Sequence, residues 1–229
     1  VAGERNNDAI DGGDGVWQLS SDPNWSESTG DLNGQFDNGA YAIFAGRAGD
    51  VTTSDAGGDI HVAGMQFATD GYTIAGDALT LDGSAATIRV GDGTLPGANY
   101  TATIDAGLTG GATLVKSDLG TLILGGDNSY TGGTSVTGGT LSVSSDNNLG
   151  AAGGGVLLDG ANLLASAAMD SARSIELAAA GGTITTDAAL RLVGVITGDG
   201  GLTKAGTGSL VLSGDNDFAG AVEVEDGTL

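Results

Sequence analysis

The fold is decided by a stretch that the chain contains twice. Residues 116–141 read KSDLGTLILGGDNSYTGGTSVTGGTL, and residues 204–229 read KAGTGSLVLSGDNDFAGAVEVEDGTL. The copies align without a gap at an offset of 88, and 12 of the 26 aligned positions are identical. Within each copy, short runs with Leu or Val at alternate positions are separated by Gly, Asn and Asp. This pattern is typical of short strands joined by tight corners.

Similar short runs recur along most of the chain, which favours a β-solenoid whose coils stack to bury one narrow core. If 88 residues make four coils, one coil has about 22 residues, enough for three short strands. The sequence therefore predicts an all-β solenoid of about ten coils, with an antiparallel β-sandwich as the alternative. Residues 167–180, AAMDSARSIELAAA, contain good helix formers, but we expect a strand there because Gly181-Gly182 and a β-rich run follow.

Composition excludes several classes of protein. Of 229 residues, 44 are Gly, 29 are acidic and 7 are basic, so the net charge is −22. A surface of this charge repels phosphate backbones and anionic lipids, so we expect neither nucleic-acid binding nor peripheral membrane binding. The chain has no Cys, which excludes a disulfide scaffold and a Cys nucleophile.

The repeated unit resembles the autotransporter-associated β-strand repeat of type V secreted bacterial proteins. The resemblance is carried by GGATLVKSDLGTLILGGDNSYTGGTSVTGGTLSV at 110–143 and GDGGLTKAGTGSLVLSGDNDFAGAVEVEDGTL at 198–229. It implies a right-handed parallel β-helix. We expect residues 1–50 to form an N-terminal cap with the first coils, and residues 51–229 to form the β-helix, truncated at its C-terminal end.

The resemblance also implies a function. Such a passenger is exported through the periplasm, displayed on the bacterial cell surface and linked in the full-length protein to an outer-membrane β-barrel. It would act in adhesion or in cell–cell self-association, binding a host or bacterial surface ligand or another copy of itself. The alternatives are a passive stalk that displays a missing functional domain and a polysaccharide-active β-helix enzyme.

The sequence offers little for catalysis, and we expect no enzyme activity. His61 is the only His, and in DIHVAG its side chain should point away from those of Ile60 and Val62, to the surface. No G-x-S-x-G motif is present. Paired carboxylates such as Glu223 and Glu225 are expected by chance in so acidic a chain. We therefore assign no catalytic residue and no cofactor.

A calcium site is the strongest metal hypothesis. Asp215, Asp217 and Asp226 match three positions of an EF-hand loop, but the first copy does not keep these acids. The recurring turn residues Asn128, Asn216, Gly132 and Gly220 are predicted to be structural. Each Asn should cap a turn by bonding local backbone, and could stack on equivalent side chains of neighbouring coils.

Two further groups of residues have predicted roles. Lys116 and Lys204 occupy the same position of the repeat and should fix a coil corner or neutralise nearby Asp. The aromatic residues Trp17, Trp25 and Tyr41 belong to a cluster that precedes residue 50. They suit a hydrophobic cap over the first coil, with a ligand-facing platform for carbohydrate as the alternative.

Overall fold

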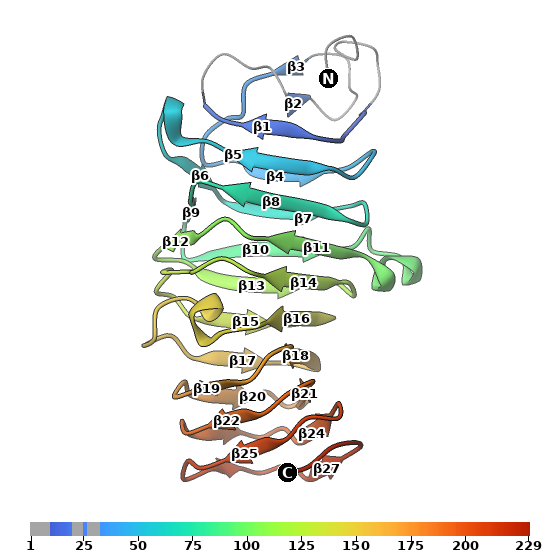
Figure 1. Ribbon diagram of the computed structural model, residues 1–229, viewed down its shortest axis with the longest axis vertical. Coiled ribbons are helices and arrows are strands. Elements are labelled where there is room, and N and C mark those ends of the chain that lie inside the picture. Colours follow the sequence, from blue (N-terminus) through green and yellow to red (C-terminus); the bar gives the residue numbers. More distant parts are fainter. Residues whose placement is uncertain (1–9, 20–24, 27–32) are drawn as a thin grey trace.

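The computed structural model describes residues 10–19, 25, 26 and 33–229, which form one long stack of short parallel strands (Figure 1). The chain winds around three sides, so that strands on each side pair with strands one coil earlier and one coil later. Every described strand pair is parallel except that of β2 with β3. The predicted β-solenoid is thus confirmed, and its nine- and ten-stranded sheets agree with about ten coils.

The first side is a ten-stranded sheet. In spatial order its strands are β1 (Gly15–Trp17), β5 (Asp50–Thr53), β8 (Tyr72–Gly76), β11 (Thr101–Ile104), β14 (Thr121–Leu124), β16 (Thr140–Val143), β18 (Ala161–Ala165), β21 (Gly182–Thr186), β24 (Leu202–Ala205) and β27 (Val222–Val224).

The second side is a nine-stranded sheet. Its strands are β4 (Tyr41–Phe44), β7 (Gly64–Phe67), β10 (Ala85–Val90), β13 (Thr113–Ser117), β15 (Thr134–Val136), β17 (Val156–Leu158), β20 (Ile175–Leu177), β23 (Ile196–Gly198) and β26 (Asp217–Phe218).

The third side is interrupted. Its strands are β6 (Ile60–Val62), β9 (Leu79–Leu81) and β12 (Leu108–Gly110), then β19 (Met169–Ser171), β22 (Leu190–Leu192) and β25 (Leu210–Leu212). The remaining elements are β2 (Trp25–Ser26), β3 (Asn33–Gly34) and the 3-10 turns η1 (Asp55–Gly57), η2 (Leu95–Asn99) and η3 (Asp146–Leu149). The stretch 167–180 contains β19 and β20, so it is extended, as predicted. No described segment forms an apolar helix of membrane-spanning length.

Side chains alternate between a buried inward position and an outward one along most strands, as the period of a β-strand requires. The inward positions align from coil to coil. On the first side, one such column is Ala102, Leu122, Leu141, Leu163, Ile184 and Lys204. These inward columns form the core, which is aliphatic over most of its length.

Coil length is nearly constant. Paired residues are 19 to 23 positions apart in most strand pairs, for example Thr121 with Thr140 and Tyr41 with Gly64. The steps that span η2 are 28 to 30 residues, and the step from β1 to β5 is 36. The segment around η2 leaves the stack as a side loop (Figure 1).

One inference from the repeat is wrong. Lys116 lies in β13 on the second side, whereas Lys204 lies in β24 on the first side, in the column of Leu122. An offset of 88 residues is therefore four coils and one further side, not four whole coils. The motif recurs with the same local structure, but it is rotated by one side around the solenoid axis.

Candidate interaction face and corner clamps

The outward face of the first side has a polar column along most of the solenoid. The pairing register aligns the outward residues Thr101, Thr121, Thr140, Asn162, Thr183, Thr203 and Glu223. Two hydrogen bonds link neighbouring coils here: Asn162 Nδ2 donates to Thr140 Oγ1 at 3.4 Å, and Thr185 Oγ1 donates to Asn162 Oδ1 at 2.9 Å. The face therefore offers regularly spaced hydroxyl and amide groups.

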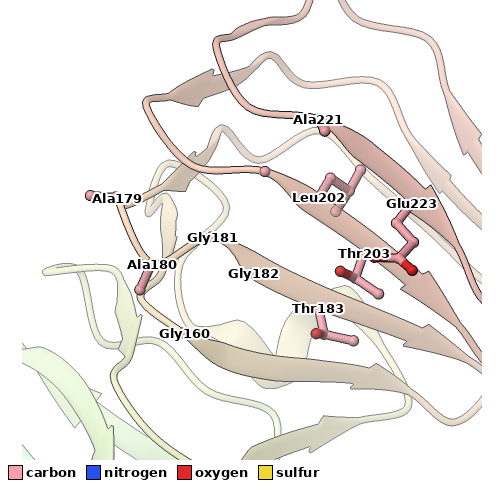
Figure 2. Close-up of a pocket in the computed structure, with 11 residues that line it drawn as sticks. Gly160, Ala179, Ala180, Gly181, Gly182, Thr183, Leu202, Thr203, Ala221 and Glu223 are labelled. Atoms are coloured by element: carbon pink, nitrogen blue, oxygen red, sulfur yellow. The ribbon is translucent and has the colours of Figure 1, made fainter.

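An open groove of about 330 Å³ runs beside the last part of this column (Figure 2). Four glycines without side chains form the base of the groove and give it its depth: Gly160, Gly181, Gly182 and Gly201. Ala179, Ala180 and Ala221 also line it, and Leu202, Thr183, Thr203 and Glu223 come from the strands of the first side. Glu223 is the single titratable residue of the lining. The groove lacks the paired carboxylates of a glycosidase.

Buried lysines hold two corners of the solenoid. Lys116 and Lys204 are both fully buried. Lys116 Nζ donates to the carbonyls of Ser117, Asp118 and Gly138 at 2.8 to 3.1 Å. Burial lowers the pKa of Lys116 to about 8, although the charge of Asp118 acts in the opposite direction.

Lys204 makes the same three bonds, to the carbonyls of Ala205, Gly206 and Asp226. In both copies the acceptors lie one, two and 22 positions after the lysine. Of the two roles predicted for these lysines, fixing a corner is confirmed, and the acceptors are carbonyl oxygens of two successive coils. We call this arrangement the lysine clamp.

The asparagines bridge coils, and do not cap their own turn. Asn128 Oδ1 accepts the N–H of Leu108 at 2.7 Å, and its Nδ2 donates to the carbonyl of Asn148 at 2.6 Å. Asn216 Oδ1 accepts the N–H of Ile196 at 2.8 Å. These partners are 20 residues away, so the expected local bond is replaced by bonds to neighbouring coils, on both sides for Asn128 and to the preceding coil for Asn216.

Gly132 and Gly220 are required by close approach of the neighbouring coil. A Cβ at Gly132 would overlap the backbone of Ala112 and Thr113, and one at Gly220 would overlap that of Gly200 and Gly201. Neither glycine has a positive φ. The repeat thus keeps Gly here because two backbones pass with no room for a side chain.

Sequence reasoning missed Arg173, which is 3% exposed. Its Nε bonds the Asp146 carboxylate at 3.0 Å. Its other nitrogens donate to the carbonyls of Asp146, Leu149, Gly150, Ala151 and Gly154. It therefore holds the loop around η3, where the third side has no strand. The only available signal was the scarcity of basic residues, which makes each of the seven a candidate for a specific role.

The metal candidates do not converge. Asp215, Asp217 and Asp226 are all exposed. Asp226 Oδ1 accepts the N–H of Gly227, and its carbonyl belongs to the lysine clamp. Within the described part of the chain, no three His, Cys, Asp or Glu side chains are grouped so that they could hold a metal ion.

His61 faces outward between the buried Ile60 and Val62, as predicted. Its Nδ1 lies 2.9 Å from Asp82 Oδ1. This pair is half exposed, and no described Ser or Thr hydroxyl bonds the His61 ring.

The three aromatic candidates have different environments. Trp17 is 1% exposed, and its ring lies 5.0 Å from that of Trp25 and 4.9 Å from that of Phe36. Trp25 is partly buried against the same core. Tyr41 is 42% exposed, so it is the one candidate whose ring is presented to solvent. We propose that the Trp17–Trp25–Phe36 cluster caps the first coils.

Comparison with known proteins shows that this parallel β-solenoid is similar to passengers of the autotransporter type. Residues 114–143 and 202–229 match the model of the Passenger-associated-transport-repeat. The chain is also 51% identical, over 137 residues, to the adhesin BmaC autotransporter of Brucella suis biovar 1 (strain 1330). That alignment covers 57% of this chain but 4% of the adhesin. No solved structure matches.

The two matches confirm the resemblance to autotransporter passengers, and with it an exported, cell-surface chain. The two matched segments are the ones that contain the lysine clamps, so the sequence family and the corner geometry coincide.

Proposed function

We propose that this chain acts in adhesion, as a rod that binds surface ligands or other copies of itself along its length. The observation that carries the proposal is the 51% identity to a protein named an adhesin. The architecture supports it, because clamped coils of similar length keep the outward columns in register. Weak contacts repeated along such a face add up when two rods, or a rod and a surface, align.

The ligand would meet mainly polar groups on this face. The column from Thr101 to Glu223 offers hydroxyl and amide groups, and the groove at Gly181 and Gly182 admits a chain close to the backbone. Neighbouring coils are about 4.8 Å apart, so an extended partner can bond several coils in succession. We propose a host or bacterial surface ligand, or a second copy, as the partner.

A passive stalk is the second candidate, and the near-constant coil length favours it. An enzyme is disfavoured, because the relative is named an adhesin and the groove contains a single titratable side chain. We therefore propose a role without catalysis.

The test is to display this chain, fused to a carrier barrel, on a bacterium that neither clumps nor adheres. Sedimentation of the cells and their retention on host-cell layers measure self-association and adhesion, and added soluble chain should compete with either. The variant Thr183→Lys/Thr203→Lys alters the groove wall, and Ser135→Lys/Thr197→Lys is a matched double change at outward positions of the second side. Loss with the first variant alone supports the lateral face. If the cells neither clump nor adhere, the adhesive function is rejected and the passive stalk is the remaining candidate.

A further inference from the structure

The outward face of the second side presents an exposed aromatic ring near the N-terminal end. Tyr41 and Ile43 project from β4 and are 42% and 56% exposed. The register places Gly64 and Thr87 in the column of Tyr41, and Gln66 and Arg89 in the column of Ile43. An exposed aromatic ring therefore stands beside an amide and a guanidinium that come from the next two coils.

The Tyr41 ring is held in place by contacts with β7 of the next coil. Its hydroxyl donates to the Met65 carbonyl at 2.8 Å. The ring lies against Gly64, where an added Cβ would be 2.7 Å from Cε2 and 2.9 Å from Cδ2. An aromatic ring that covers a glycine in this way shields the backbone of the sheet from solvent. The outer part of the Tyr41 ring remains exposed. Because the ring is already immobilised, a ligand that stacks on it loses little additional conformational freedom.

The polar neighbours are also fixed. Gln66 Nε2 donates to the Gly91 carbonyl at 3.0 Å, and Arg89 Nε donates to Asp118 Oδ2 at 2.7 Å. Asp118 has a φ of 65°, the one positive value at a non-glycine position among the described residues. Its carboxylate also accepts the N–H groups of Gly93 and Leu119. Residues with such a backbone conformation are concentrated at functional sites. Here the conformation belongs to the residue whose carboxylate holds Arg89 in place.

Both side chains keep hydrogen-bonding capacity that the described residues do not use. The Gln66 Oε1 and the terminal nitrogens of Arg89 have no protein partner among the described residues. Asp118 balances the charge of Arg89, so the cluster as a whole is close to neutral. The chain carries −22 overall, which disfavours an anionic ligand.

We propose that Tyr41, Gln66 and Arg89 form a binding site for a neutral glycan. One face of a sugar ring carries C–H groups that pack on an aromatic face, and its hydroxyls both donate and accept hydrogen bonds. An open, rigid ring beside an amide oxygen and guanidinium donors matches this chemistry. The site deepens the proposed adhesive function by naming a ligand class, and it rests on that function for its biological setting.

The test is calorimetric titration of the purified chain with neutral oligosaccharides of glucose, mannose and galactose, up to about 10 mM. A sulfated oligosaccharide forms the anionic arm. We expect at least one neutral probe to bind. Tyr41→Leu should weaken binding by about tenfold or more, and Arg89→Met by a smaller factor. Tyr41→Phe, which keeps the ring, should retain most of the affinity. Val211→Ser, at an exposed position on β25, is the matched control and should bind normally.

Thermal unfolding of each variant separates a binding defect from misfolding, and Tyr41→Phe keeps the test valid if Tyr41→Leu fails to fold. The proposal is overturned if no neutral probe binds, if Tyr41→Leu binds normally, or if only the sulfated probe binds. Loss of cell adhesion in Tyr41→Leu without any sugar binding would point to a protein ligand and overturn the glycan class. Sugar binding by a chain that mediates no adhesion would leave this inference intact and reject the proposed function.

Discussion

The two repeat copies, residues 114–143 and 202–229, share their local structure but lie on different sides of the solenoid. Lys116 projects into the core from the second side and Lys204 from the first. Each nevertheless bonds carbonyls one, two and 22 positions further on. The motif therefore specifies a corner and the next coil, and it does not mark one face of the rod.

This difference separates what builds the rod from what it displays. Because the copies are rotated by one side, their outward residues belong to different columns. A ligand that follows one face would not meet the motif at each recurrence. Features used for binding should therefore include residues outside the repeated motif, such as Tyr41 or Thr183.

The copies also differ in their surroundings, which predicts unequal responses to the same change. In this 229-residue chain the first copy has coils stacked on both of its ends, whereas Val222 and Val224 of the second copy lie in the last coil and are each 47% exposed. Equivalent substitutions should thus cost more in the first copy.

The largest effect is expected from Leu122→Asp, compared with Leu210→Asp. Both leucines are fully buried, and a carboxylate without a partner in this core costs about 4 kcal/mol or more. Leu122 is enclosed by Ala102 and Leu141, so its variant should lose cooperative unfolding. Leu210→Asp should affect mainly the last coils. Circular dichroism and hydrogen exchange measure both, and unchanged melting of the two variants would contradict the core assignment.

A smaller effect is expected when a lysine clamp is removed. Lys116→Ala removes the donor of three half-buried carbonyl oxygens and opens a cavity, at a cost of about 2–4 kcal/mol. Lys204→Ala should cost less, because the carbonyl of Asp226 belongs to an exposed coil. Denaturant unfolding gives the free energies, with the exposed Arg191→Ala as the control for loss of a cation. Lysine variants as stable as that control would show that the clamp does not stabilise the fold.

The pH dependence of the free energy of unfolding tests the burial of Lys116 in the first clamp. The pKa of Lys116 is lowered to about 8 by burial, below its unfolded value of about 10.4. As the pH falls from 10.4 towards 8, the unfolded state binds a proton that the folded state does not, so stability decreases. Raising the pH from 8 to 10 should therefore stabilise the chain by on the order of 1–2 kcal/mol.

Above pH 10 the trend should reverse. Burial raises the pKa of Tyr130 to about 12, so its stabilising contribution is complete below about pH 10 and is lost as the pH rises towards 12. Unfolding free energies measured from pH 7 to 12 should pass through a maximum near pH 10. In Lys116→Met the rise between pH 8 and 10 should disappear while the fall above 10 remains. A rise that persists in this variant would assign it to other groups.

The strands and corners were predictable because alternation and Gly-rich turns are local signals. The stretch 167–180 shows this, since β-rich sequence on its C-terminal side outweighed its helix formers. The rotation of the repeat was not predictable, because 88 residues fit four coils of 22 as well as four and a third coils of about 20.

The contacts between coils could not be predicted from the sequence either. The partners of Asn128 depend on which residues lie 20 positions before and after it. Arg173 contacts a loop 19 to 27 positions earlier. Such pairings depend on the length of each coil, which varies from 19 to 23 over most of the chain. The burial of Trp17 likewise depends on the packing of residues far along the chain.

The smallest effects are expected at the bridging asparagines, where the copies differ in the number of bonds. Asn128 bonds the coils on both sides, whereas in this 229-residue chain Asn216 bonds the N–H of Ile196 in the preceding coil. Asn128→Ala should cost about 1–2 kcal/mol and Asn216→Ala about 1 kcal/mol or less. Hydrogen exchange offers a residue-level readout, because each variant should expose one amide, that of Leu108 or of Ile196. Asn128→Asp keeps the acceptor for Leu108 but places a carboxylate oxygen against the Asn148 carbonyl. It should therefore preserve protection of the Leu108 amide and still lose stability. Equal losses for the two alanine variants, with no change at either amide, would show that these bonds do not join the coils.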